Sequence, residues 1–255
     1  MKRVRYQSYD GIHWGELEGG CVHQLSGMMG SATGKRVDLS DVTLLAPCEP
    51  RLIVCVGKNY AKHVVEMGGS VEALPQEPGL FLKGLNTLVG PGDDIPYPDW
   101  TEDLQYEGEL AVVIARAMRD VSPEDALSYV LGYTCAIDVT ARDKQRSDLQ
   151  WFRGKSADGF CPVGPWLETD LDPGDLRLRT LVNDEVRQDG HTSDLIFDVP
   201  YVLSYVSRVA TLSPGDVVLT GTPEGVGRLA PGDLVEVSID AIGTLQNRVA
   251  APREG

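Results

Sequence analysis

The sequence predicts a mainly β protein with a few helices, and three observations lead to that fold class. Pro-Gly-Asp recurs ahead of strand-like segments, and Pro followed by Gly is the favoured centre of a type II turn. Three short β-like runs near the N-terminus are separated by Asp-Gly and Gly-Gly, which are hairpin signals. Helical periodicity is confined to short segments between the strands. The Pro-Gly-Asp turns occupy residues 91–93, 173–175, 214–216 and 231–233.

Composition excludes several classes of function. The net charge is −15, from 23 Lys and Arg against 38 Asp and Glu, which argues against nucleic-acid binding because phosphate contacts need clustered cations. We find no charged-then-apolar leader and no apolar run long enough to cross a bilayer, so we expect a cytoplasmic protein without a membrane partner. The five cysteines are scattered and form no CxxC pair, which favours reduced core residues over a zinc site.

Residues 1–50 are predicted to form a small N-terminal β-module. Its three strand-like runs cover residues 3–9, 12–17 and 21–25, and a stretch rich in Gly and Ser then interrupts the pattern. Pro47 and Pro50 mark a boundary near residue 50. The main domain is therefore expected over residues 51–255.

The main domain opens with a buried strand, residues 51–56, followed by a helix over residues 60–67. His63 and Glu66 lie three residues apart, so they share one face of that helix. Such a pair could hold and deprotonate a water molecule, with the glutamate orienting the imidazole. Alternatively, it is a solvated surface pair. The segment 69–78, rich in Gly and Pro, is predicted to be a mobile loop.

Two carboxylates precede an apolar strand over residues 106–114. Glu107 and Glu109 are two residues apart, and side chains alternate along a strand, so both should point to one face. That face continues into apolar residues. If the carboxylates are buried there, they need a cation or a proton; alternatively, the strand end is exposed and both are solvated. Asp138 ends another apolar run and could join them. Three such oxygens suit a hard divalent cation such as Mg²⁺, Mn²⁺ or Ca²⁺.

The rest of the chain alternates further helices and strands. Ser122 and Pro123 predict a helix that runs to about residue 130, and Asp198 can cap a second helix over residues 199–209. The last strands are predicted in the segments 176–182, 216–221, 233–240 and 244–250.

Two loops carry candidate binding groups. Lys155 lies in the loop 151–165 between glycines and aromatic residues, where a lysine could equally be solvated. The segment 219–227 lacks the Gly-Lys-Ser/Thr of a phosphate loop. Its backbone amides and the Thr222 hydroxyl could still bind a carboxylate, although a tight hairpin would look the same.

Six motifs, in this order, resemble the fumarylacetoacetate hydrolase family across residues 51 to about 250. This resemblance implies a mixed β-roll or sandwich fold, a homodimer, and a divalent metal held by three carboxylates, which match Glu107, Glu109 and Asp138. The first 50 residues resemble the small N-terminal module of bacterial members. The motifs are VGKNYAKHVVEMG, PGLFLKGLN, YEGELAVVI, GYTCAIDVTARD, the Lys155 loop with CPVGP, and TGTPEGVG.

The resemblance also assigns roles outside the metal site. The lysine that faces the metal-bound substrate matches Lys155, and its burial beside the metal should lower its pKa. The catalytic pair of the family's lid helix matches His63 and Glu66. The substrate-binding residues are then Thr222, Gly221 and Lys83.

The activity that follows is metal-dependent hydrolysis of a carbon–carbon bond in an acylpyruvate-type 2,4-dioxo acid, with Mg²⁺ as the favoured ion. The alternative within enzymes is an isomerase or decarboxylase of a 2-hydroxymuconate-type diacid from aromatic catabolism, similar to a 2-hydroxyhepta-2,4-diene-1,7-dioate isomerase, or an oxaloacetate decarboxylase. An alternative of another class is a non-catalytic β protein with a structural Ca²⁺. Fold and metal site alone do not separate these outcomes.

Overall fold

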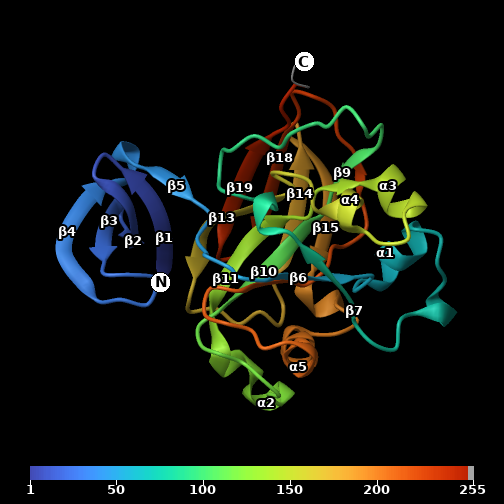
Figure 1. Ribbon diagram of the computed structural model, residues 1–255, viewed down its shortest axis with the longest axis horizontal. Helices are drawn as coiled ribbons and strands as arrows, with labels where there is room; N and C mark the ends of the chain where they lie inside the picture. The colour runs from blue at the N-terminus through green and yellow to red at the C-terminus, as the bar shows by residue number, and fades with distance from the viewer. Residues whose placement is uncertain (252–255) are drawn as a thin grey trace.

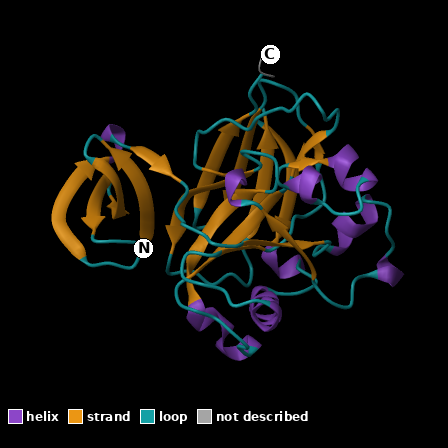
Figure 2. Cartoon of the chain, viewed as in Figure 1, coloured by secondary structure: helices purple, strands orange, loops and turns teal. Residues whose placement is uncertain are grey.

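The computed structural model describes residues 1–251 and confirms a mainly β fold of mixed sheets with a few short helices (Figures 1 and 2). The largest sheet has twelve strands, and its pairing is antiparallel except for β16 with β6 and β8 with β13. Its main path is β4 (Ala32–Asp38), β3 (Cys21–Leu25), β2 (Gly11–Glu18), β1 (Lys2–Ser8), β13 (Cys161–Glu168), β11 (Val130–Ile137), β10 (Gly108–Ile114), β16 (Val217–Leu219), β6 (Ile53–Gly57) and β7 (Gly79–Lys83), with β5 (Thr43–Leu45) beside β1 and β8 (Leu88–Val89) beside β13.

Within residues 1–251, two smaller sheets and five α-helices complete the architecture. The helices are α1 (Ala61–Glu66), α2 (Pro123–Ala126), α3 (Arg142–Ser147), α4 (Phe152–Lys155) and α5 (Val199–Val209). The four-stranded sheet contains β15 (Glu185–His191), β14 (Arg177–Val182), β18 (Leu234–Ile239) and β19 (Gly243–Arg248), and the three-stranded sheet contains β12 (Thr140–Ala141), β9 (Leu104–Tyr106) and β17 (Gly227–Arg228).

The N-terminal strands curl into a lobe at the left of Figure 1. The turns at Asp10-Gly11 and Gly19-Gly20 join β1, β2 and β3 as the sequence predicts. Strand β4 was not predicted, because its largely exposed residues show no apolar alternation and only its pairing with β3 defines it. The lobe is continuous with the large sheet through the pairing of β1 with β13. Residues 252–255, the end of the predicted main domain, lie outside the described residues.

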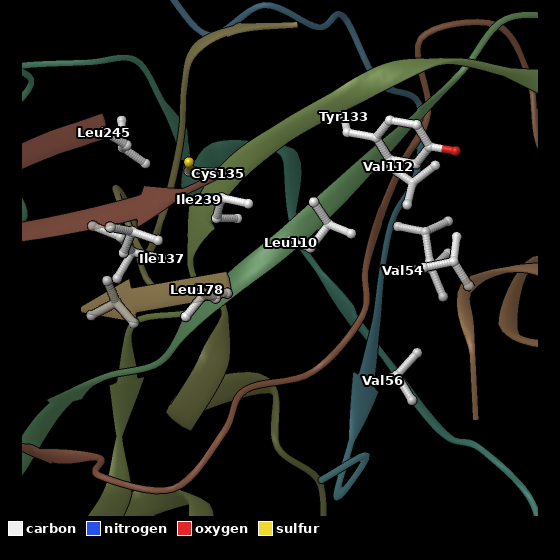
Figure 3. Close-up of a cluster of buried hydrophobic side chains, with 14 of the residues drawn as sticks. Val54, Val56, Leu110, Val112, Tyr133, Cys135, Ile137, Leu178, Ile239 and Leu245 are labelled. Atoms are coloured by element: carbon white, nitrogen blue, oxygen red, sulfur yellow. The ribbon is translucent and has the colours of Figure 1, made fainter. Parts of the chain in front are cut away.

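The large sheet buries side chains on both of its faces. Along β10, Leu110, Val112 and Ile114 pack in one cluster, whereas Ala111 and Val113 pack in another. Figure 3 shows the first cluster, in which β10 and β11 face the four-stranded sheet. Both faces are therefore covered, which explains why β10 is fully buried and reads as a continuous apolar run.

The helix predicted over residues 199–209 is confirmed together with its cap. The helix predicted from Ser122 to about residue 130 is shorter, because α2 ends at Ala126, a 3-10 helix (Leu127–Tyr129) follows it, and Ser122 makes no capping hydrogen bond. The Asp198 carboxylate accepts a hydrogen bond from the Tyr201 amide at 2.9 Å and caps α5 over the predicted bounds. Helices α3 and α4 were not predicted, because their polar sequences RDKQRS and FRGK show no apolar period. Lys155 was predicted in a loop, and this is wrong: it is the last residue of α4.

Two strand predictions also need correction. The stretch 106–114 is not one strand, because the chain leaves the three-stranded sheet at β9 and enters the large sheet at β10, with Glu107 between them. The turn at residues 91–93 launches no regular strand; Ile95 forms only a single bridge with Val249. The turns before β16 and β18 behave as predicted, since Gly215 and Gly232 have φ of 88° and 94°, which a type II turn requires.

Two further expectations concern the membrane and the thiols. In residues 1–251, we find no helix with the length and apolar character needed to span a bilayer. All five cysteines are free, and every one except Cys21 is buried, as expected of reduced core residues.

Candidate functional site

The site lies around a cavity of about 190 Å³ next to β10. Helices α1, α3 and α4 and strands β6, β7 and β10 all contribute to its wall. The residues that line it are Val56, Gly57, Lys58, His63, Met67, Phe81, Glu107, Glu109, Arg142, Gln145, Arg146, Trp151, Lys155 and Thr222.

Three carboxylates converge beside this cavity. Antiparallel pairing sets Gly108 opposite Ile137, and the Asp138 amide donates to the Glu107 carbonyl at 2.8 Å. One oxygen from each of Glu107, Glu109 and Asp138 lies within 4.8 Å of the others. The three residues are 5%, 1% and 0% exposed, which rules out the exposed strand end.

Buried cations surround the three carboxylates. The Lys155 ammonium donates to Glu107 Oε2 at 2.8 Å and to Asp138 Oδ2 at 2.7 Å. The Arg142 guanidinium pairs with Glu107 Oε1, and Lys83 Nζ lies 2.7 Å from Asp138 Oδ1. Each of these three cations is at most 3% exposed, so the alternative of a solvated Lys155 is also ruled out. Charges this deeply buried are tolerated because they are paired.

The environment separates the pKa values of the two glutamates. Burial acts to raise the pKa of Glu107, but the charges of Lys155 and Arg142 hold it well below its ordinary value. The pKa of Glu109 is raised well above its ordinary value, first by burial and then by the neighbouring charges of Asp138 and Glu107. Glu109 is thus the carboxyl that most readily keeps a proton in the absence of another cation.

Between the carboxylates alone, the pKa of Lys155 is raised, so the lowered pKa expected beside a bound metal stays a prediction. Burial alone acts to lower its pKa, but the adjacent carboxylates of Asp138 and Glu107 outweigh burial and raise it. The ammonium is therefore stabilised by the carboxylates that the sequence assigns to the metal.

His63 and Glu66 form a pair that reaches the cavity. His63 Nδ1 is 3.0 Å from Glu66 Oε2. The histidine is only 6% exposed, so a fully solvated pair is ruled out, although Glu66 itself is exposed. Glu66 Oε1 accepts a hydrogen bond from the Gly225 amide at 2.9 Å. Lys62 lies 3.4 Å from Glu224, which is a second contact between α1 and the same turn. Helix α1 is thereby held over the cavity.

The turn after β16 supports the carboxylates as well as the cavity wall. Thr222 lines the cavity and donates from Oγ1 to the Gly108 carbonyl at 2.8 Å. The Gly221 amide donates to Glu109 Oε2 at 2.6 Å, so the carboxylate bound by this turn belongs to the protein itself. The segment is therefore more than a tight hairpin, because the Thr222 hydroxyl bonds to the backbone of Gly108, between the two glutamates.

Lys83 lies behind the site and does not line the cavity. Besides pairing with Asp138, its ammonium donates to the carbonyls of Val139 at 3.1 Å and Phe160 at 2.8 Å, and also to the Lys155 carbonyl. The substrate-binding role expected for Lys83 therefore stays a prediction, and its contacts indicate a supporting position.

Sequence reasoning missed several polar residues at the site, Arg146 among them. Arg142 and Gln145 on α3 line the cavity, and Gln188 on β15 accepts a hydrogen bond from the Gly108 amide at 2.9 Å. Lys58 also lines the cavity and has a φ of 60°. Arg142 and Lys58 carried a usable signal, because both lie inside quoted motifs, GYTCAIDVTARD and VGKNYAKHVVEMG.

The donor set fits a hard divalent cation. Carboxylate oxygens are the ligands that Mg²⁺, Mn²⁺ and Ca²⁺ prefer, and the three ligand atoms are close enough to share one ion. Lys155 already places a positive charge against two of them. The buried carboxylates thus form a site that requires cations, and Glu107, Glu109 and Asp138 are the residues that could hold a metal.

Known proteins resemble this chain over nearly its whole length. Residues 52–250 match the family described as fumarylacetoacetate (FAA) hydrolase C-terminal, and residues 1–47 match one described as Rv2993c-like, N-terminal. The chain is 43% identical over 224 residues to oxaloacetate tautomerase YisK of Bacillus subtilis, covering 83% of this chain and 74% of that protein.

Two solved structures add to this comparison. A 2-hydroxyhepta-2,4-diene-1,7-dioate isomerase from Mycobacterium marinum has a TM-score of 0.91 and 43% identity, covering 98% of this chain and 99% of that one. A fumarylpyruvate hydrolase from Pseudomonas aeruginosa, in complex with Mn²⁺ and pyruvate, has a TM-score of 0.75 and 35% identity, covering 80% and 91%.

Proposed function

The chain belongs to the fumarylacetoacetate hydrolase family, and from that premise we propose that it is a divalent-metal-dependent hydrolase. Its proposed substrate is an acylpyruvate-type 2,4-dioxo acid, in which it cleaves a carbon–carbon bond. The observation that carries this proposal is the His63–Glu66 pair, whose histidine lines the same cavity as Glu107 and Glu109 of the buried carboxylate cluster.

The proposed ion is Mg²⁺, held by Glu107, Glu109 and Asp138. A divalent cation there would bind the 1-carboxylate and 2-oxo oxygens of the substrate and stabilise the negative charge that develops during cleavage. The relative from Pseudomonas aeruginosa, solved with Mn²⁺ and pyruvate, supports a divalent ion with a 2-oxo acid in this fold. A homodimer is the proposed assembly.

The protein's own residues would move the protons. Because Glu66 occupies His63 Nδ1, the other ring nitrogen is left to take a proton from water. The water oxygen then adds to the 4-carbonyl carbon, the C3–C4 bond breaks, and its electron pair goes to C3. Protonation of C3 gives pyruvate and releases the acyl group as a carboxylic acid, so one water is consumed. Lys155 is proposed to stabilise the substrate oxygens, and Thr222 to contact the substrate from the cavity wall.

A second candidate is isomerisation or tautomerisation of a 2-oxo or 2-hydroxy diacid. It is favoured by the relatives that cover most of the chain at 43% identity, which are named as an isomerase and a tautomerase. The same histidine would then shift a proton on the substrate carbon without water attack. Decarboxylation of oxaloacetate uses the same charge stabilisation.

A panel assay separates these candidates. Purified protein with Mg²⁺ or Mn²⁺ is mixed with acetylpyruvate, fumarylpyruvate, oxaloacetate and a 2-hydroxymuconate-type diacid, and pyruvate, CO₂ and the keto–enol ratio are followed. Release of pyruvate with uptake of one water supports the hydrolase. If the protein shifts a proton or releases CO₂ but forms no pyruvate from any 2,4-dioxo acid, the hydrolase proposal is wrong and the second candidate is supported. A protein that merely unfolds when the metal is stripped, and turns over none of these acids, would be a structural metal protein.

A further inference from the structure

The wall of the cavity is more basic than the protein as a whole. The chain carries a net charge of −15, yet the cavity-lining residues include only two acidic side chains, Glu107 and Glu109. Four basic residues line the same cavity: Lys58, Arg142, Arg146 and Lys155. The cavity therefore attracts anions in a protein that otherwise repels them.

Two of these four cations are already neutralised. Arg142 and Lys155 pair with Glu107. Lys58 is exposed and, within residues 1–251, no carboxylate oxygen lies within 4.0 Å of its ammonium. Arg146 approaches Asp103 only at 4.0 Å, and its side chain is 64% exposed. Lys58 and Arg146 are thus the cations of the wall that remain available to a ligand.

The backbone of Lys58 is held in an unusual conformation. Its φ of 60° lies in the left-handed region, which residues with a Cβ rarely adopt unless their surroundings impose it. The preceding Gly57 lies under Trp151, since a Cβ on that glycine would be 3.1 Å from the indole ring. Strained positions of this kind cluster at ligand sites. Here the strain occurs at the end of β6, where the lysine side chain joins the cavity wall.

We infer that Lys58, assisted by Arg146, binds the second carboxylate of a dicarboxylate substrate. This inference rests on the proposed function, in which the 2-oxo acid end of the substrate is bound at the carboxylate cluster. Lys58 is a specificity-determining residue of the wall, because its ammonium lies more than 4.0 Å from every carboxylate oxygen of that cluster. The cavity volume of about 190 Å³ is below that of drug-sized pockets, so the diacid is a compact one.

The charges around the cluster show why a second anion would bind elsewhere. The carboxylates Glu107, Glu109 and Asp138 are matched by three buried cations, so a bound divalent ion adds two positive charges. A 2-oxo carboxylate and the charge that develops on its oxo oxygen can neutralise these two. A further carboxylate on the substrate then finds its partners at Lys58 and Arg146.

The test compares 2-oxo acids that differ only in the second carboxylate. Mn²⁺-loaded protein is titrated calorimetrically with 2-oxoglutarate against 2-oxopentanoate, and with 2-oxoadipate against 2-oxohexanoate. The parent should bind at least one diacid about 10-fold more tightly than its monoacid partner. In Lys58→Gly this preference should fall to about one, with the monoacid affinity unchanged, and Lys58→Arg should restore it.

Lys58→Gly also separates specificity from folding, because glycine is better suited to a positive φ. Its melting temperature should equal or exceed that of the parent, and Ala241→Gly, which relieves a φ of 62° outside the cavity, is the matched control. The inference is overturned if neither pair shows a diacid preference, or if Lys58→Gly keeps it. Failure of all four acids to bind the Mn²⁺-loaded parent would instead contradict the proposed function.

Discussion

Glu109 is the residue whose charge state decides how the carboxylate cluster binds a cation. Burial and two neighbouring carboxylates raise its pKa well above the ordinary value, so it tends to hold a proton when no metal is bound. Metal binding must displace that proton, and the affinity for Mg²⁺ or Mn²⁺ should therefore increase as pH rises. The same group links pH to folding, because the folded protein keeps a proton that the unfolded chain loses above pH of about 4.

Replacing Glu109 by Gln should weaken metal binding by at least about 10-fold. Mutating a residue that only supports a metal ligand already costs about 10-fold or more, and Glu109 is proposed as a ligand itself. It should also leave the metal-free protein at least as stable as the parent at pH 8, because the parent loses stability as pH rises through the raised pKa. Calorimetric titration in two buffers of different ionisation enthalpy measures the affinity and the protons released. If the variant binds the metal as tightly as the parent, Glu109 is not a metal ligand.

His63 should act on the reaction and not on the metal. Its ring contacts Glu66, and no carboxylate of the cluster pairs with it in the part of the chain that the structure describes. His63→Ala should therefore bind Mn²⁺ within about threefold of the parent, since none of the three ligands is removed. Turnover should fall by about 100-fold or more, as is typical when a general base is lost. The measurements are calorimetry and the panel assay on one preparation. A loss of metal in His63→Ala would show that the roles are wrongly assigned.

At the scale of elements, Gln188 connects β15 to the backbone between the two glutamates. It is fully buried, accepts from the Gly108 amide, and donates to Thr222 Oγ1 at 2.7 Å and to the Pro223 carbonyl at 2.8 Å. Gln188→Ala removes three hydrogen bonds to buried groups, so the free energy of unfolding should fall by about 2 kcal/mol or more. Metal affinity should fall as well, because the segment carrying the ligands loses its support.

Urea unfolding and calorimetry on Gln188→Ala measure both effects. The matched control is Gln246→Ala, which removes an exposed strand glutamine whose amide, among the described side chains, hydrogen-bonds only to Glu236. The control should change the free energy of unfolding by less than about 0.5 kcal/mol. An equal, small effect in both variants would mean that Gln188 does not support the site.

Helix α1 and the segment 69–78 are predicted to move as a lid. The segment is mostly exposed, and α1 contacts the turn after β16 through one hydrogen bond and one ion pair. Amide hydrogens there should exchange fast in the free protein and more slowly with Mn²⁺ and oxalate, while those of β10 stay protected in both states. Hydrogen exchange with mass spectrometry is the measurement. Identical exchange of the segment with and without oxalate would argue against a lid.

At the scale of the whole molecule, the N-terminal module and the main domain share a core. Trp14 and Leu25 of the module pack in one cluster with Ile53 and Val113 of the main domain. Trp14→Ala should lower the free energy of unfolding by about 3–5 kcal/mol, as is usual for a buried tryptophan. Unfolding should stay a single transition, because both parts lose the same contacts.

Urea titration followed by circular dichroism tests this coupling. Tyr9→Ala, which truncates a fully exposed aromatic side chain of the same module, should leave the midpoint unchanged. Two separate transitions, with only one of them shifted by Trp14→Ala, would show that the module folds independently of the main domain.

The sequence by itself determined the local features of this protein. These features depend on residues that are close together in the chain, so the sequence shows their signals directly. They are the hairpins of the module, the cap of α5 and the turns before β16 and β18. The convergence of Glu107, Glu109 and Asp138 was also predictable, because carboxylates precede one apolar run and end another, and the motifs around them resemble one family.

Tertiary structure decided everything that depends on pairing between distant segments. The break at Glu107 arises because its two flanking strands join different sheets, and β4 exists only through its partner strand. Lys83 and Arg142 become partners of the carboxylates because the fold buries them there, and burial turns an ordinary cation into one that must be paired. No spacing in the sequence reports burial, so the pairing of Lys83 and Arg142 with the carboxylates, and the unpaired charge of Lys58 on the cavity wall, became visible only in three dimensions.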